Sequence, residues 1–170
     1  MNKIKISAVA YTNTKPFIYG IERANILSQI ELSLDVPSDC AQKLIENKVD
    51  IGLVPVAVVP SIPNASIISD YCIGSVGAVN SVFIFSNVPV AHIKSVKLDP
   101  QSRTSNQLAQ VLLKFHFKVN VSFTDNQDAQ TDAALDDFDL EDYLMNKLDF
   151  ELTAEKRKAL DLFLSYISQL

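Results

Sequence analysis

The chain has 170 residues, of which 48% are hydrophobic and 21% charged, and its formal net charge is −5. This length suits one domain or two small lobes with a buried core, and the composition is not that of a disordered chain. A mildly acidic chain does not attract nucleic acid or an anionic membrane, and two cysteines exclude a disulfide framework or an all-cysteine zinc site.

The first half of the chain alternates predicted strands with short helices. Apolar and polar residues alternate from Lys3 to Val9, which is typical of a strand, and Pro16 suits the first turn of a helix. Ser38 is the expected cap of the second helix. In chain order, the expected elements are strand 3–9, helix 16–20, strand 30–36, helix 37–48, strand 49–55, a short helix or turn 56–63, and strands 65–69 and 78–86.

The second half repeats the alternation. Its expected elements are strand 95–99, helix 102–117, strand 119–123, and helices 139–148 and 151–170. Thr153 is the expected cap of the last helix. Strands that alternate with helices predict an α/β fold with a largely parallel or mixed sheet.

An acidic segment at 124–137 interrupts this pattern. Between Val119 and Asn146 there are eight acidic residues and no Lys or Arg. The segment lacks helical or alternating periodicity and is interpreted as a solvated connector. A carboxylate cluster that binds a cation is the alternative, but no glycine follows the acids as it does in a calcium loop.

The N-terminus lacks the apolar stretch of a secretory signal, and no segment approaches the ~20 consecutive apolar residues of a membrane span. We therefore expect a cytoplasmic protein that does not enter a membrane.

The well-known catalytic motifs are absent from the sequence: there is no glycine-rich phosphate loop, no G-x-S-x-G and no H-E-x-x-H. The two histidines and two cysteines are interpreted as structural residues. What remains are polar residues at predicted strand ends, in the segments 11–15, 80–81 and 102–105. Ligands of open α/β sheets bind beyond the carboxyl ends of strands, where helix N-termini favour carboxylates. These residues therefore form either an anion site or a set of ordinary caps.

Four segments then identify a family. SAVAYTNTKPFIYG, DVPSDCAQKLIENKVDIGLVPVAV, IGSVGAVNSVFIFS and VKLDPQSRTSNQLAQVLL, in this order and spacing, resemble the chorismate dehydratases of menaquinone biosynthesis by the futalosine pathway. The resemblance covers residues 3–115, and LDFELTAEKRKALDLFLSYI is similar to the family's C-terminal helix. It implies a two-lobed fold of the type II periplasmic-binding-protein-like class with mixed sheets.

The resemblance also implies an activity. These lyases remove water from chorismate, a small dicarboxylate, to form 3-[(1-carboxyvinyl)oxy]benzoate without a metal or an organic cofactor. Carried over by motif, Asn13 is the catalytic residue, and the substrate-binding residues are Tyr11, Thr14, Ser81, Ser102, Arg103, Thr104 and Ser105. The alternatives are a non-catalytic module that binds a small anion and the related dihydroxynaphthoate synthase.

The chain departs from the family after residue 123, where family members continue through more of the second lobe. The resemblance therefore implies a first lobe of residues 1–85 plus 138–170 and a partial second lobe of residues 86–135. With one wall of the cleft incomplete, we expect weak chorismate affinity and little or no turnover. Exposed strand edges are expected to invite dimerisation or aggregation.

Overall fold

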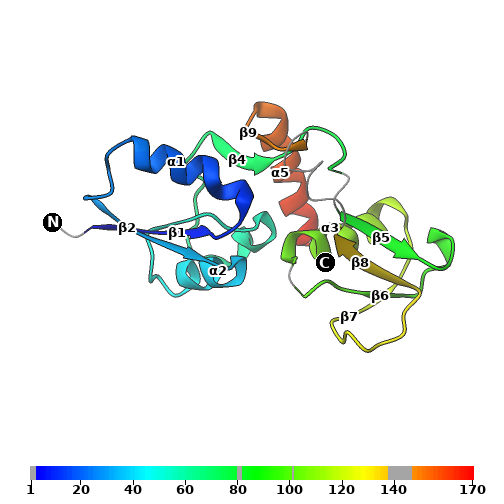
Figure 1. Cartoon of the computed structure of the whole chain (residues 1–170). Helices are drawn as coiled ribbons and strands as arrows, with labels where there is room; N and C mark the ends of the chain where they lie inside the picture. Colours follow the sequence, from blue (N-terminus) through cyan, green and yellow to red (C-terminus); the bar gives the residue numbers. More distant parts are fainter. Residues whose placement is uncertain (1–2, 80–81, 101, 138–146) are drawn as a thin grey trace. The chain divides into compact units, whose positions relative to one another are not determined.

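A computed structural model describes residues 3–79, 82–100, 102–137 and 147–170. The chain forms two compact units, Met1–Ser69 and Asp70–Leu170, and each is described by itself (Figure 1). The lobes expected from the sequence, 1–85 with 138–170 and 86–135, stay a prediction.

Unit 1 is a parallel sheet with strand order β2-β1-β3. Its strands are β1 (Ile4–Val9), β2 (Ile30–Asp35) and β3 (Ile51–Gly52). Its helices are α1 (Lys15–Arg23) and α2 (Pro37–Ile45), with 3-10 turns at Thr12–Thr14 (η1) and Val56–Ser61 (η2). The order predicted from the sequence is confirmed, but the expected strand 49–55 pairs over two residues only, and the first helix is longer than predicted.

Helix α2 covers one face of this sheet and closes the core of unit 1. Ala41 on α2 packs against Val58 and Ile62, and a Cβ at Gly52 on β3 would overlap the Leu44 side chain. Glycine at position 52 therefore lets helix and strand approach closely. The predicted cap at Ser38 is wrong: the helix begins at Pro37, since the fixed φ of proline suits the first turn, and no side chain caps it.

Unit 2 contains two sheets and one long helix. Its strands are β4 (Tyr71–Gly74), β5 (Val82–Ser86), β6 (Ser95–Lys97), β7 (Ser122–Thr124), β8 (Ala133–Asp137) and β9 (Asp149–Glu151). Its helices are α3 (Arg103–Val111), which continues as a π-helical turn at Leu112–His116, α5 (Ala154–Ile167) and a 3-10 turn at Val90–His92. Strands β5-β8-β6-β7 form a mixed sheet, and β4 pairs with β9 in antiparallel fashion.

Strand β8 corrects the interpretation of the acidic segment as a connector. Its residues lie in the middle of the mixed sheet, antiparallel to β5 and parallel to β6. Ala133 and Leu135 point into the core beside Val96 and Leu113. Two alternating apolar positions next to acids are too short a pattern to predict a strand from the sequence. The strand β8 is established by its hydrogen bonds to β5 and β6.

The β4–β9 pair corrects two other predictions. Residues 65–69 are not a strand, and the strand in this region is Tyr71–Gly74. The last helix begins at Ala154, because residues 149–151 extend to pair with β4. The predicted cap is confirmed: the Thr153 hydroxyl accepts the Lys156 N–H at 3.3 Å. The predicted helix 139–148 falls mainly on residues outside the described part.

None of the helices among the described residues has the length and apolar character required to cross a membrane.

Candidate functional site

The first group of predicted site residues forms one turn directly after β1. The Ala10 N–H donates to the Asp35 carbonyl at 2.9 Å, and the Thr14 N–H then closes the turn η1 on the Tyr11 carbonyl at 3.0 Å. Tyr11 is exposed, the Asn13 Oδ1 atom is buried, and Thr14 is 1% exposed. The structure thus brings Tyr11, Asn13 and Thr14 together in one turn, in which Tyr11 is exposed, Asn13 is half-buried and Thr14 is buried.

The Thr14 hydroxyl is the unusual group of this turn. Its Oγ1 atom is buried and has no hydrogen-bond partner among the described residues, although Thr14 stands at the N-cap position of α1. A buried hydroxyl without a partner costs free energy, so such groups are rare in folded proteins. Pro16 at the start of α1 removes one N–H that the hydroxyl could otherwise have capped.

A polar cluster that sequence reasoning missed lies at the base of this turn. We define it as Ser7, Ser33, Asp35 and Lys43. Asp35 Oδ2 accepts hydrogen bonds from Lys43 Nζ at 2.6 Å, Ser7 Oγ at 2.7 Å and Ser33 Oγ at 2.7 Å. These bonds, with that of Lys43 first, lower the pKa of Asp35 from 3.8 to about 2. The carboxylate therefore stays charged at neutral pH.

Cys40 adjoins the polar cluster on α2. Its side chain is fully buried, and this burial raises the pKa of the thiol. A buried, protonated thiol is a poor nucleophile, which agrees with the interpretation of Cys40 as a structural residue.

The second group of predicted site residues begins α3 in unit 2. Ser102 is the N-cap: its Oγ accepts the Ser105 N–H at 3.4 Å and donates to the Ser105 hydroxyl at 2.6 Å. Arg103 is exposed and Thr104 is half-buried. At a helix start the first N–H groups have no intrahelical partners, so this end of α3 suits a carboxylate.

An asparagine holds the loop before α3 and was not predicted to matter. Asn106 Oδ1 accepts the Asp99 N–H at 3.0 Å, and Asn106 Nδ2 donates to the Asp99 carbonyl at 2.7 Å. These two hydrogen bonds fix the loop that follows β6 against the first turn of α3. An asparagine four residues after a serine cap is the only signal for it in the sequence.

We expect Ser102→Ala to destabilise unit 2 by about 1 kcal/mol, because the change removes the cap of α3. Urea unfolding followed by circular dichroism measures the loss. Ser165→Ala is the matched control: Ser165 donates to the Leu162 carbonyl inside α5 and caps nothing. An effect of Ser102→Ala no larger than that of the control would contradict the capping role.

The two groups lie in different units, so their geometry is given separately. Ser81, the remaining predicted substrate-binding residue, lies outside the described residues. The structure therefore assembles each group locally, and the joint site that the sequence predicts stays a prediction.

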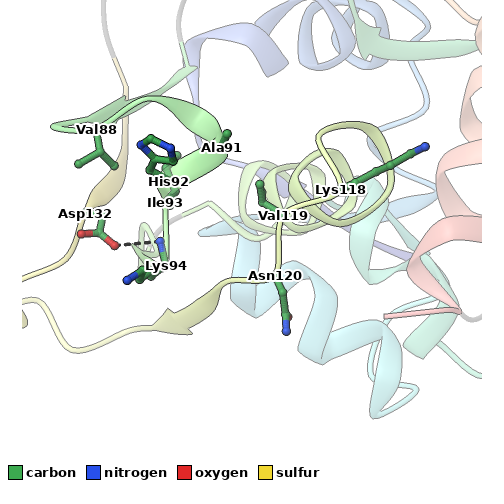
Figure 2. A pocket seen from close by; sticks show the side chains of 9 residues that line it. All are labelled: Val88, Ala91, His92, Ile93, Lys94, Lys118, Val119, Asn120 and Asp132. Atoms are coloured by element: carbon green, nitrogen blue, oxygen red, sulfur yellow. Dashed lines mark hydrogen bonds between the residues drawn. The ribbon is translucent and has the colours of Figure 1, made fainter.

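Unit 2 also has a hollow of about 650 Å³ beside Asp132. Figure 2 shows His92, Lys94 and Asn120 on its wall, with the Lys118 side chain directed away from the others. The Asp132 carboxylate is occupied, since it accepts the Lys94 N–H at 2.8 Å, and this bond is the main cause of its lowered pKa. Lys94 directly precedes β6, and α3 follows it. The hollow therefore lies at the start of this strand, and the first turn of α3 comes after its end.

Within the described part of the chain, no three His, Cys, Asp or Glu side chains come together as a metal site would require. The polar groups of the turn after β1 and of the start of α3 are hydroxyls, amides and a guanidinium. These groups suit an anionic organic ligand better than a cation.

Comparison with known families identifies the chain. The model of a menaquinone biosynthesis family matches residues 4–141, which is most of the sequence and includes all three predicted site segments. The chain belongs to the menaquinone biosynthesis family. The resemblance stated from the sequence is thereby confirmed at the level of the family, and no curated protein matches the chain.

Solved structures similar to this family member have low sequence identity to it. An ATP phosphoribosyl transferase (HisG:HisZ) complex from Thermotoga maritima is 11% identical, with 98% of this chain and 97% of that chain covered and a TM-score of 0.53. The aliphatic sulphonate binding protein SsuA from Escherichia coli is 17% identical, with 99% and 72% covered and a TM-score of 0.44. At these identities the likeness concerns the fold alone. The α/β fold with mixed sheets predicted from the sequence is confirmed, and its two-lobed, type II periplasmic-binding-protein-like class stays what the resemblance implies.

Proposed function

We propose that this chain dehydrates chorismate to 3-[(1-carboxyvinyl)oxy]benzoate in menaquinone biosynthesis. The observation that carries the proposal is the family match over residues 4–141. The match supports a role in menaquinone biosynthesis, and the motifs at 11–16 and 102–105 narrow the role to the dehydratase reaction.

The start of α3 supports a dicarboxylate as substrate. The first turn of α3 carries the hydroxyls of Thr104 and of the capping pair Ser102 and Ser105, and Arg103 adds an exposed guanidinium. Hydroxyls, amide N–H groups and a guanidinium are the usual partners of a carboxylate. One carboxylate of chorismate is assigned to this turn.

The reaction removes a proton from the ring carbon that carries the ether and a hydroxyl from the adjacent carbon. The electron pair of the broken C–H bond becomes the third double bond of the benzene ring, and the proton and hydroxyl leave as water. No oxidant is consumed, so the residues need only orient the substrate and stabilise developing charge. We assign to Asn13 the donation of a hydrogen bond to the leaving hydroxyl or to a carboxylate, and to a substrate carboxylate the acceptance of the proton.

The purified chain incubated with chorismate tests the proposal, with the product followed by liquid chromatography and mass spectrometry. We expect slow formation of a compound lighter than chorismate by one water molecule. Binding of chorismate without any such product would overturn the dehydratase assignment in favour of a non-catalytic anion-binding module.

Asn13→Ala is expected to lower the turnover of chorismate by about 100-fold, the loss typical of a deleted charge-stabilising donor. The melting temperature should change little, because the residue lies in a turn and contributes little to the core of unit 1. Thr12→Ala, in the same turn but exposed, is the matched control and should retain turnover. Unchanged turnover of Asn13→Ala would remove this residue from the catalytic role, and unfolding would assign it a structural one.

A further inference from the structure

The polar cluster of Ser7, Ser33, Asp35 and Lys43 occupies a place that α/β proteins normally fill with apolar side chains. Ser7 and Ser33 are register partners on β1 and β2, and they point to the face of the sheet that α2 covers. The opposite face is apolar and is buried in part, since Ile30 is 6% and Leu34 54% exposed. On the polar face Ser7 is fully buried, so the strands are covered there although the side chains are polar.

An ion pair in this place adds little to stability. The Lys43 and Asp35 side chains are 31% and 16% exposed, so both charges have lost much of their hydration. The attraction within a buried pair roughly offsets that loss, and apolar side chains of similar volume often stabilise as well or better. What the pair provides is geometry, because a single oxygen of Asp35 is held from three directions by side chains of β1, β2 and α2.

The location of Asp35 connects this geometry to the candidate site. Asp35 is the last residue of β2, and its side chain is bound to Lys43 in the last turn of α2. Its backbone carbonyl accepts the Ala10 N–H, which is the last bond of β1 before the chain turns at Tyr11. One residue thus joins α2 to the base of the turn that contains Asn13.

We propose that Asp35 and Lys43 are positioning residues that fix the turn Tyr11–Thr14 relative to α2. Lys43 holds the Asp35 side chain, Asp35 holds Ala10, and Ala10 sets where the turn begins. The consequence for turnover rests on the proposed function, whereas the consequence for the turn itself does not.

The double variant Asp35→Asn/Lys43→Met removes the link to α2 and little else. The asparagine still offers an oxygen to Ser7 and Ser33, and methionine retains the apolar stem of the lysine. Lys43→Arg keeps the charge and the link. Glu46→Gln/Lys48→Met makes the same chemical change at an exposed ion pair at the end of α2 and is the matched control.

Amide hydrogen exchange by NMR on the whole labelled chain tests the positioning role. In the double variant, exchange at Ala10 and Thr14 should rise about tenfold, while exchange at Ile6 and Ala8 within β1 changes much less. Lys43→Arg and the control double variant should retain the exchange of the unmodified chain. If the double variant does not fold, Lys43→Gln alone is measured in the same way, with the same expected local rise.

Unchanged exchange at Ala10 and Thr14 would overturn the proposal. An equal rise of the exchange rates throughout unit 1 would also overturn it, because the two residues would then only stabilise the unit as a whole. Turnover of chorismate is the second measurement: kcat should fall about tenfold with a smaller change in KM, and Lys43→Arg should restore it. A chain that never converts chorismate but shows the local exchange effect would refute the proposed function and leave the positioning role intact.

Discussion

Leu113→Ala is expected to destabilise unit 2 by about 3 kcal/mol. Leu113 is 1% exposed and packs in the core formed by α3 and the mixed sheet, beside Val96, Ala133 and Leu135. Truncation removes buried apolar surface and leaves a cavity that strands paired on both sides cannot easily close. Urea unfolding followed by circular dichroism measures the change.

Leu112→Ala provides the control, because Leu112 is the neighbouring residue of the same π-helical turn and is 36% exposed. Its truncation should have less than half the effect of Leu113→Ala. Equal effects of the two substitutions would show that the turn itself, rather than the packing of Leu113, determines the stability of unit 2.

Local patterns predicted the elements that depend on their own residues. The alternation of Ile4, Ile6 and Ala8 with polar neighbours located β1 to within one residue, and the hydroxyl of Thr153 identified the cap of α5. Strand periodicity and capping are properties of a few consecutive residues, so the sequence contains the whole signal.

Elements that depend on distant partners were missed. Strand β9 exists because Glu151 pairs with Tyr71, and β8 exists because its acidic segment is held between β5 and β6. Neither segment has a long alternating pattern of its own. The free energy that makes them strands comes from neighbours that the local sequence does not reveal.

The same distinction separates the two parts of the candidate site. The turn after β1 and the capped start of α3 were predicted, because strand ends and caps are local features. The polar cluster was not, since Ser7 and Asp35 are 28 residues apart and meet only when β1 and β2 pair. From the alternation of polar and apolar residues alone, the polar side of such strands is expected to face water. In the structure, Lys43 on α2 covers that side at Ser33 and Asp35.

Stability of unit 1 is expected to fall by about 2 kcal/mol as the pH is lowered from about 4 to below 2, through the titration of Asp35 alone. The hydrogen bond from Lys43, followed by those from Ser33 and Ser7, lowers the pKa of Asp35 from 3.8 to about 2 in the folded protein. In this range the unfolded chain binds the proton first, so acid favours unfolding. The contribution is complete above the unfolded pKa and is lost as the pH falls through the folded pKa.

The Asp35→Asn variant isolates this contribution from the other carboxylates with lowered pKa values, Glu46, Asp132 and Asp149, which titrate in the same direction. Urea unfolding of both proteins at a series of pH values gives two stability curves, and their difference belongs to Asp35. That difference should be constant above pH ~4 and shrink steadily below it, because the protonated acid and the amide are then both neutral. A difference that does not change with pH would mean that Asp35 titrates alike in the folded and unfolded chain. The three short hydrogen bonds to its Oδ2 atom would then not hold the carboxylate in its charged form.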